Sequence, residues 1–212
     1  DDVWNVKFLE TIVSLHKNFP SCQILATGYY LEDLRGLKER NILKKLPFKG
    51  NEGIITNYFE VAAKSSPPIS SASVVVKKDL LTEIGGFPYG IRSGEDLLTW
   101  AKLAFKSQIG YSTVPMVIGY MNESHELIYK PLRSPDKNDL VGMALTELFL
   151  TSEGKTQRGL RKYISHWYKM RVSVCLRAGD YKGVWEYAIK SLKFNIFNYK
   201  VFCFVILSFF PR

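Results

Sequence analysis

Cysteine is scarce in this sequence of 212 residues, and the three that occur are far apart. They are Cys22, Cys175 and Cys203, and none lies in a Cys-x-x-Cys pair or at a cysteine–histidine spacing typical of zinc. The pattern indicates neither a disulfide framework nor a zinc site. Because such cysteine usage is typical of a reducing compartment, we expect a cytoplasmic protein, with a peripheral position on the inner face of the membrane as an alternative.

Long hydrophobic runs are also lacking. The most apolar run, "VFCFVILSFF" from Val201 to Phe210, has about half of the roughly 20 residues that a membrane-spanning helix needs. It therefore predicts a buried or interfacial helix. The chain opens on Asp1 and Asp2 and reaches an amphipathic pattern at once, without the features of a signal peptide, and we interpret this opening as a start within a domain.

The composition is that of a globular protein with a basic surplus. Hydrophobic residues make up 46% of the chain and aromatic residues 14%, enough for one large or two small domains. The net charge of +9 favours an acidic partner, which could be a nucleotide phosphate, an anionic membrane surface or nucleic acid. Nucleic acid is the least expected of the three, because the sequence has no helix-turn-helix, zinc or RNA-recognition signature.

Alternation of helix and strand patterns predicts an α/β fold for the first part of the chain. A helix is expected over residues 6–16, followed by a buried strand at "CQILATGYY" and a surface excursion over residues 31–53. The apolar face expected for the first helix consists of Val6, Leu9, Ile12, Val13 and His16.

The same alternation continues to about residue 121. "SVVV" predicts a strand, and "KKDLLTEI" predicts a short helix that Gly85 closes in the left-handed conformation. A further helix is expected after Gly94, and "YSTVPMVIGYM" predicts a strand in which Pro115 favours an edge or a strand start.

From Asn138 onward only helical patterns occur. Four helices are expected, near residues 138–151, 155–178, 180–193 and 198–210. "KPLRSPDK" is typical of a linker, so we predict an α/β domain over residues 1–135 and a helical region over residues 136–212.

Two adjacent carboxylates, Glu95 and Asp96, follow a loop rich in proline and glycine. Ser93 and Asp96 have the spacing of a capping box, which would give the pair a structural role. The alternative is catalytic, because a loop that leads into a helix often lines a site. The positive end of the helix would hold Asp96 ionised and lower its basicity, which a partner that removes the carboxylate from water would restore.

The stretch "SSASVVVKKDLLTEIGGFPYGIRSGEDLLTWAKLAF" resembles the acceptor side of family 2 glycosyltransferases, which are inverting enzymes with the GT-A fold. In that family a strand of small residues, a short helix, Gly-Gly-Phe, a loop and a Glu-Asp pair at a helix start follow in this order. The Asp of the pair is taken as the general base. The resemblance therefore implies that Asp96 is the base, with Glu95 beside it. Lys102 stands where the family frequently has Arg.

The opening stretch "DDVWNVKFLETI" resembles the metal-binding stretch of the same family, although on its own it would also suit an acidic helix start. The resemblance implies that Asp1 and Asp2 lie at a site for Mg²⁺ or Mn²⁺, which prefer such hard oxygen ligands. It also implies a nucleotide-binding half before Asp1, so this chain alone is expected to be inactive. The resemblance is good over residues 1–30 and 66–125.

Further site residues follow only from the resemblance. Apart from the carboxylates, the residues implied to bind substrate are Ser70, Ser71, Gly85, Gly86, Phe87, Trp100 and His125. For the two serines, the alternative is that small residues only allow close packing. For Trp100 the alternative is a structural place in the core, and for His125 it is a solvated position in a loop. The implied function is transfer of a sugar, with inversion, from a nucleotide-diphosphate sugar to a glycan or a lipid-linked acceptor, as in polysaccharide biosynthesis. The alternatives are a non-catalytic scaffold of the same fold and a basic module that binds membrane or nucleic acid.

The helical region contains "RGLRKYISHWYKMR", in which cations and aromatic residues alternate. Basic residues beside an apolar, aromatic helix favour anionic interfaces, so residues 163–212 are expected to contact an anionic membrane surface. The alternative is a helical appendage with solvated cations.

Overall fold

The computed structural model describes residues 2–121, 135–136 and 138–210. The chain forms two compact units, Asp1–Lys130 and Pro131–Arg212. The sequence places the division near residue 135, at the linker pattern.

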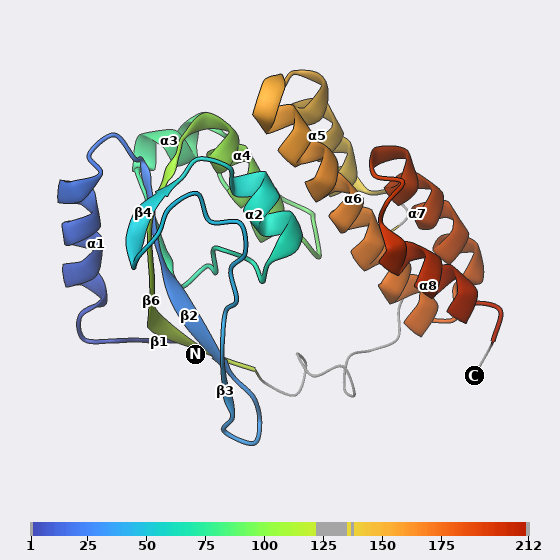
Figure 1. The fold of residues 1–212 in the computed structure, drawn as a ribbon, viewed down its shortest axis with the longest axis horizontal. Helices are drawn as coiled ribbons and strands as arrows, with labels where there is room; N and C mark the ends of the chain where they lie inside the picture. Colours follow the sequence, from blue (N-terminus) through green and yellow to red (C-terminus); the bar gives the residue numbers. More distant parts are fainter. Residues whose placement is uncertain (1, 122–134, 137, 211–212) are drawn as a thin grey trace. The chain divides into compact units, whose positions relative to one another are not determined.

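The N-terminal unit contains a six-stranded mixed sheet (Figure 1). Its two long strands pair in parallel at the centre of the sheet, while the four short strands pair antiparallel with one or the other of them. The strands are β1 (Val3–Trp4), β2 (Ile24–Glu32), β3 (Lys38–Arg40), β4 (Glu52–Ile55), β5 (Val74–Val76) and β6 (Ile109–Tyr120). The predicted α/β class is confirmed at this level.

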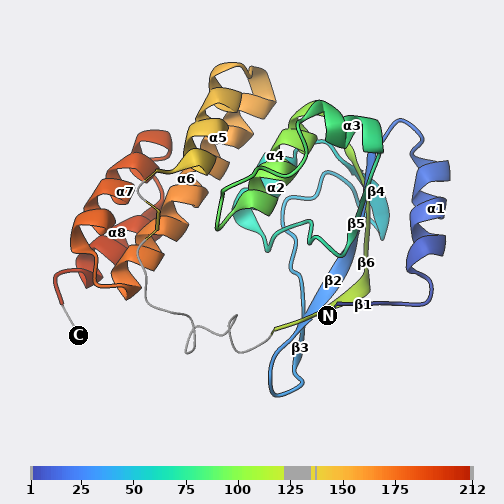
Figure 2. The same ribbon diagram turned by 180° about the vertical axis from the view of Figure 1, so that it is seen from behind.

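Helices cover both faces of this sheet. Figures 1 and 2 show α1 (Phe8–Asn18) on one face and α2 (Tyr58–Lys64) and α4 (Glu95–Lys106) on the other. A short helix, α3 (Lys78–Glu83), ends where Gly85 adopts a φ of +82°, as predicted. The sequence patterns missed α2, and they did not separate β3 and β4 from the surface excursion.

The apolar face predicted for α1 is wrong except at Ile12. The helix buries Phe8, Ile12 and Leu15, whereas Leu9 and Val13 are more than half exposed. Phe8, Ile12 and Leu15 follow at intervals of four and three residues, so they share the face that contacts the sheet. Phe8, which the prediction left out, is fully buried on this inward face.

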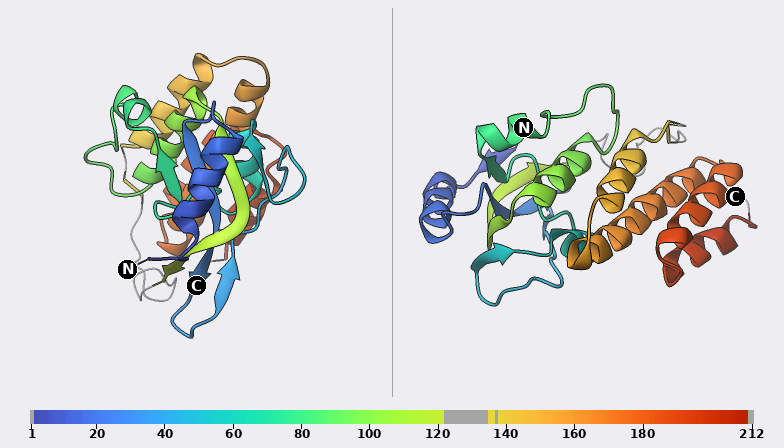
Figure 3. Two further views of the ribbon diagram at one scale, coloured as in Figure 1. Left: turned by 90° about the vertical axis from the view of Figure 1, so that its left-hand side faces the viewer. Right: turned by 90° about the horizontal axis from the view of Figure 1, so that it is seen from above.

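Pro115 lies inside a central strand, so its predicted place at an edge or strand start is also wrong. β6 pairs with β2 on one side and with β1 and β4 on the other, and Pro115 lies opposite Gly28 at a shift of register. Irregular pairing at this point accommodates a residue that has no amide hydrogen. A Cβ at Gly28 would come within 2.7 Å of the Thr113 carbonyl oxygen, which explains the glycine there. Figure 3 shows that β6 bends along its length.

The C-terminal unit consists of four helices in its described part, and this confirms the predicted pattern (Figure 3). They are α5 (Leu140–Leu150), α6 (Gly154–Arg177), α7 (Tyr181–Phe194) and α8 (Tyr199–Leu207). Gly154 and Gly179 adopt positive φ angles of 59° and 70°, which suit glycine at the two predicted breaks.

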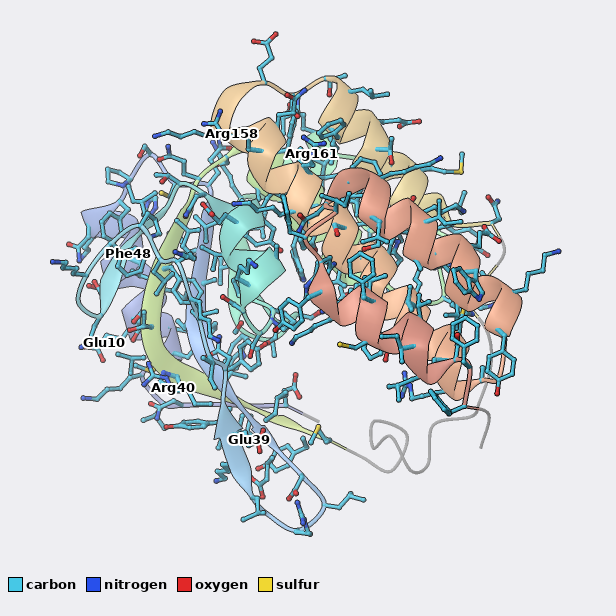
Figure 4. The ribbon with its side chains drawn as sticks, turned by 45° about the vertical axis from the view of Figure 1, so that its right-hand side comes forward. Glu10, Glu39, Arg40, Phe48, Arg158 and Arg161 are labelled. Atoms are coloured by element: carbon cyan, nitrogen blue, oxygen red, sulfur yellow. The ribbon has the colours of Figure 1, made fainter. Side chains whose placement is uncertain are left out.

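The long helix α6 is the centre of this unit. Tyr163, Trp167 and Tyr168 are buried, so the aromatic residues of the basic segment belong to the core. Arg171 is also nearly buried, and its guanidinium lies 3.4 Å from an Asp139 carboxylate oxygen. The cations that remain exposed on α6 include Arg158 and Arg161, near its N-terminal end (Figure 4).

In the described parts of both units, no helix is both long enough and apolar enough to cross a membrane.

Candidate functional site

Asp96 lies in the first turn of α4, but it does not take part in a capping box with Ser93. The residue at the cap position is Gly94, which has a φ of +88° and is followed by helix from Glu95. Ser93 is exposed and lies before the cap, and no side chain caps the helix. Instead, Asp96 Oδ1 accepts a hydrogen bond from the Leu97 amide at 2.7 Å. The capping-box prediction fails because the left-handed glycine shifts the helix start one residue along the chain.

Burial makes Asp96 a stronger base than the sequence predicts. Removal from water, the largest effect, raises the pKa of its carboxyl group above the usual value. The Leu97 amide lowers the pKa of Asp96, and the neighbouring charge of Glu95 raises it further, with a net increase. The expected fall in basicity is therefore wrong, because burial outweighs the helix terminus.

Tyr29, on strand β2 of the sheet, lies near the Asp96 carboxylate. Burial raises the pKa of the Tyr29 hydroxyl to about 12, and the charge of Asp96 adds to that increase. The hydroxyl donates a hydrogen bond to the Pro67 carbonyl oxygen at 2.8 Å. Tyr29 therefore fixes the start of the segment that leads to Ser70 and lies close enough to Asp96 for the carboxylate charge to oppose ionisation of its hydroxyl.

The segment around Ser70 forms a tight turn held at both ends. The Ser73 hydroxyl accepts from the Ser70 amide at 3.1 Å and donates to the Ser70 carbonyl at 3.2 Å. Ser70 is half-buried and Ser71 is exposed, so Ser71 is the more accessible of the two predicted serines. The Trp4 indole donates to the Ala72 carbonyl oxygen at 2.9 Å, which ties this turn to the start of the chain.

The loop that follows α3 presents two exposed aromatic rings, those of Phe87 and Tyr89. Gly85 and Gly86 have φ angles of +82° and +69°, and a Cβ on either would meet no atom within 4 Å, so backbone conformation alone favours glycine. Phe87 is half exposed and packs against Trp100 in a T-shaped arrangement, with ring centroids 5.7 Å apart. Trp100 is only 2% exposed, and its indole N–H is buried without a hydrogen-bond partner among the described residues. Trp100 therefore lies in the core and packs against Phe87, whose exposed ring is available for contact.

The predicted metal ligands are only partly described. Asp2 is exposed, and its Oδ1 lies beside Gly119, at 3.4 Å from the position of a Cβ there. Asp1 and His125 lie outside the described residues. Over the described ranges no three His, Cys, Asp or Glu side chains lie close enough together to hold a metal ion. Asp2 offers a hard oxygen of the kind that Mg²⁺ accepts, but alone it does not make a site.

Two hollows in the N-terminal unit lie away from Asp96. The first, of about 370 Å³, is lined by residues that include Asn41, Thr113 and the Arg40 labelled in Figure 4. The second, of about 450 Å³, lies between α1 and β5 and includes Val13 and Val75. The Asp96 carboxylate lines neither, so the candidate site rests on the side chains around that carboxylate.

Sequence patterns missed Tyr29 and Asn41 as site-positioning residues. The Asn41 amide group accepts from the Tyr29 backbone at 3.1 Å and donates to the Tyr111 hydroxyl at 3.2 Å. A tyrosine in a buried strand needs a partner for its hydroxyl, and this requirement was the available signal for Tyr29. No comparable signal marks Asn41, which follows a run of charged residues.

Comparison with known proteins adds no family assignment. The sequence matches no protein-family model, and no curated protein matches it significantly.

Proposed function

We propose that this chain carries the acceptor-binding and catalytic-base part of an inverting glycosyltransferase of the family 2 type. The observation that carries the proposal is the partly buried Asp96 carboxylate, whose pKa burial raises, at the junction of a glycine-rich loop and α4. A general base works best when its pKa lies closer to the working pH than that of a free carboxylate. The order of motifs around it, from the turn at Ser70 to Gly85-Gly86-Phe87 and Glu95-Asp96, supports the same reaction.

In the proposed reaction, Asp96 removes the proton from an acceptor hydroxyl. The acceptor oxygen forms a bond to the anomeric carbon of the donor sugar, and the bond from that carbon to the diphosphate oxygen breaks on the opposite side. The nucleotide diphosphate leaves with the electron pair. Phe87, exposed beside the same helix, offers an aromatic face to the acceptor sugar, and the turn held by Ser73 fixes the Ser70 backbone near Tyr29.

A divalent cation, when bound, would take up negative charge on the leaving diphosphate. Asp2 is the described residue that could contribute a ligand, and Asp1 belongs to the same proposal. The resemblance further places the nucleotide pocket before Asp1. The donor in this proposal is therefore a nucleotide-diphosphate sugar, and the acceptor is a glycan or a lipid-linked sugar.

The test compares Asp96→Asn with two controls in the natural full-length protein. Transfer from UDP-glucose, UDP-N-acetylglucosamine and GDP-mannose would be measured first to find a donor. Asp96→Asn is expected to lower turnover about 10²- to 10⁴-fold, as loss of a general base does, with little change in donor affinity. Glu95→Gln should have a smaller effect. Asp79→Asn changes the second residue of α3, the same helix position in an exposed setting, and should leave turnover unchanged.

Near-normal turnover in Asp96→Asn would assign the carboxylate a structural role. A folded wild-type protein without transfer or hydrolysis of any of the three donors would favour the non-catalytic scaffold instead.

A further inference from the structure

The outer surface of α7 and α8 carries many exposed apolar side chains. On α7, Trp185 and Ile189 are four residues apart and are 46% and 53% exposed. On α8, Phe202 and Ile206 have the same spacing and are 47% and 58% exposed. Residues four apart lie on one face of a helix, so each helix presents an apolar stripe to its surroundings.

The two stripes form one surface. The ring of Phe209, just after α8, packs against Trp185 on α7 in a T-shaped arrangement, with ring centroids 5.8 Å apart. Figures 1 and 2 both show α7 and α8 side by side. We define the α7–α8 patch as Trp185, Ile189, Tyr199, Phe202, Ile206 and Phe209, all of them exposed.

Almost all of the net positive charge of the chain belongs to the unit that carries this patch. Residues 131–212 contain 14 Lys and Arg against 6 Asp and Glu, a net charge of +8 out of +9 for the whole chain. Lys182, Lys193 and Lys200 are exposed on α7 and α8 themselves. Glu186, on the same surface of α7, is neutralised by Lys190 at 2.7 Å. An apolar, aromatic patch is therefore set in a cationic surround.

We propose that the α7–α8 patch docks on the interface of an anionic lipid bilayer. Phenylalanine, tryptophan and isoleucine side chains insert at the boundary between headgroups and acyl chains, where aromatic rings are favoured. The long lysine side chains reach past them to the lipid phosphates. α7 has 14 residues and α8 has nine, too few for either to cross the bilayer, so both helices lie along the interface.

The charge and the side-chain types together favour a bilayer over other occupants. Two copies of this unit, each with a net charge of +8, would repel one another across a shared apolar contact. Nucleic acid would satisfy the lysines, but its phosphate backbone would leave Ile189, Ile206 and Phe202 without an apolar partner. An anionic bilayer satisfies both kinds of side chain.

The proposed membrane contact lies on α7 and α8, and not on the basic, aromatic segment of α6 from which the sequence predicted it. The basic and aromatic segment on α6 suggested an interface, but its aromatic side chains, such as Trp167, are buried in the helical unit. The exposed aromatic residues lie on α7 and α8. The proposal stands without the proposed glycosyl transfer, because it depends only on the surface of the helical unit.

The test measures sedimentation of the whole chain with vesicles of phosphatidylcholine, with and without phosphatidylglycerol. Binding is expected only with the anionic lipid, and it should weaken at high salt. Replacing Lys182, Lys193 and Lys200 by Gln should lower partition about 100-fold, or roughly fivefold for each lysine. The double variant Phe202→Ser with Ile206→Ser should lower it at least about tenfold, because the inserted apolar area is lost.

Matched controls lie on the N-terminal unit. Lys17, Lys49 and Lys64 are also exposed, and replacing them by Gln changes the net charge by the same amount. Leu9→Ser with Val13→Ser removes two apolar side chains that are 58% and 52% exposed on α1. Both controls should bind vesicles within about threefold of the wild type, since neither changes the α7–α8 patch.

Cys203 on α8 gives an independent readout. It is exposed, whereas Cys22 and Cys175 are buried and burial raises the pKa of both thiols, so a maleimide should react with Cys203 first. Anionic vesicles should slow this reaction, and phosphatidylcholine alone should not.

Vesicle binding that is unchanged in Phe202→Ser with Ile206→Ser would overturn the proposal. The proposal would also fail if replacing the control lysines lowered vesicle binding as much as replacing Lys182, Lys193 and Lys200. Dimerisation or duplex DNA binding that this double variant abolishes, without any vesicle binding by the wild type, would assign the patch to another partner.

Discussion

The indole of Trp4 donates a hydrogen bond to the carbonyl oxygen of Ala72 at 2.9 Å, across 68 residues of sequence. The Trp4 ring also packs against the ring of Phe8 in α1, with ring centroids 4.5 Å apart. One side chain therefore connects the start of the chain, the first helix and the turn that precedes β5. This turn contains both serines proposed to contact the acceptor.

Trp4→Phe should loosen this turn without unfolding the unit. Phenylalanine keeps a ring beside Phe8 but lacks the indole N–H, so about 1 kcal/mol of stability should be lost. Amide exchange at Ser73, whose amide bonds to the Ser70 carbonyl, should become faster. Trp185→Phe, a similarly exposed tryptophan in the other unit, should leave that exchange rate unchanged. Equal protection of Ser73 in Trp4→Phe and wild type would show that the bond does not hold the turn.

Asp96→Asn should raise stability near neutral pH. Because burial raises the pKa of Asp96 in the folded state, the protonated form is favoured there, and its stabilising contribution is lost as pH rises through the folded-state pKa. Above that pKa the ionised carboxylate destabilises the folded chain, and the neutral amide of Asn removes this cost. The difference in melting temperature between variant and wild type should narrow as the pH falls through the folded-state pKa of Asp96, and it should be smallest below about 4, the pKa of an unfolded aspartate.

The control for this prediction is Asp79→Asn, in the first turn of α3. Asp79 is exposed, and its Oδ2 lies 3.9 Å from Lys77 Nζ. Loss of this exposed carboxylate should change stability by less than about 1 kcal/mol, with little dependence on pH. A lower melting temperature of Asp96→Asn at pH 7 would mean that hydrogen bonding to the carboxylate outweighs its burial.

Arg171→Ala should destabilise the helical unit by about 3 kcal/mol or more, because it leaves a buried carboxylate without its cation. Besides the contact with Asp139, Arg171 donates to the Tyr187 hydroxyl at 2.9 Å, and its guanidinium lies 4.6 Å from the centre of the Tyr187 ring. Arg158→Ala, at an exposed position of the same helix, should cost less than about 0.5 kcal/mol. Both would be measured by urea unfolding.

A double variant separates charge from packing. Arg171→Met with Asp139→Asn keeps the bulk at both positions and the capping of α5, where the Asp139 side chain accepts from the Gly142 amide at 3.0 Å. It should recover part of the stability lost in Arg171→Ala. A single-variant cost under about 1 kcal/mol would show that Asp139 does not depend on this arginine.

Periodicity and glycine positions in the sequence determined most of the helices. The four helices of the C-terminal unit follow from their apolar repeats and from Gly154 and Gly179, because local spacing and backbone conformation are properties of short segments. The strand at Val74–Val76 and the left-handed end of α3 were predictable for the same reason. The order of local elements from Ser70 to Asp96 is likewise a property of the sequence alone.

Only the tertiary structure decided which faces are buried and what the charged groups experience. Local spacing does not show that Phe8 lies on the buried face of α1, that Pro115 lies in a central strand beside Gly28, or that the aromatic residues of α6 belong to the core. Each of these depends on contacts between segments distant in sequence. The pKa of Asp96 depends on the same contacts: the helix start predicted a lowered value, and burial raises it. Burial is set by the neighbours that the fold assembles, so the basicity of Asp96 is a property of the tertiary structure and not of its local sequence.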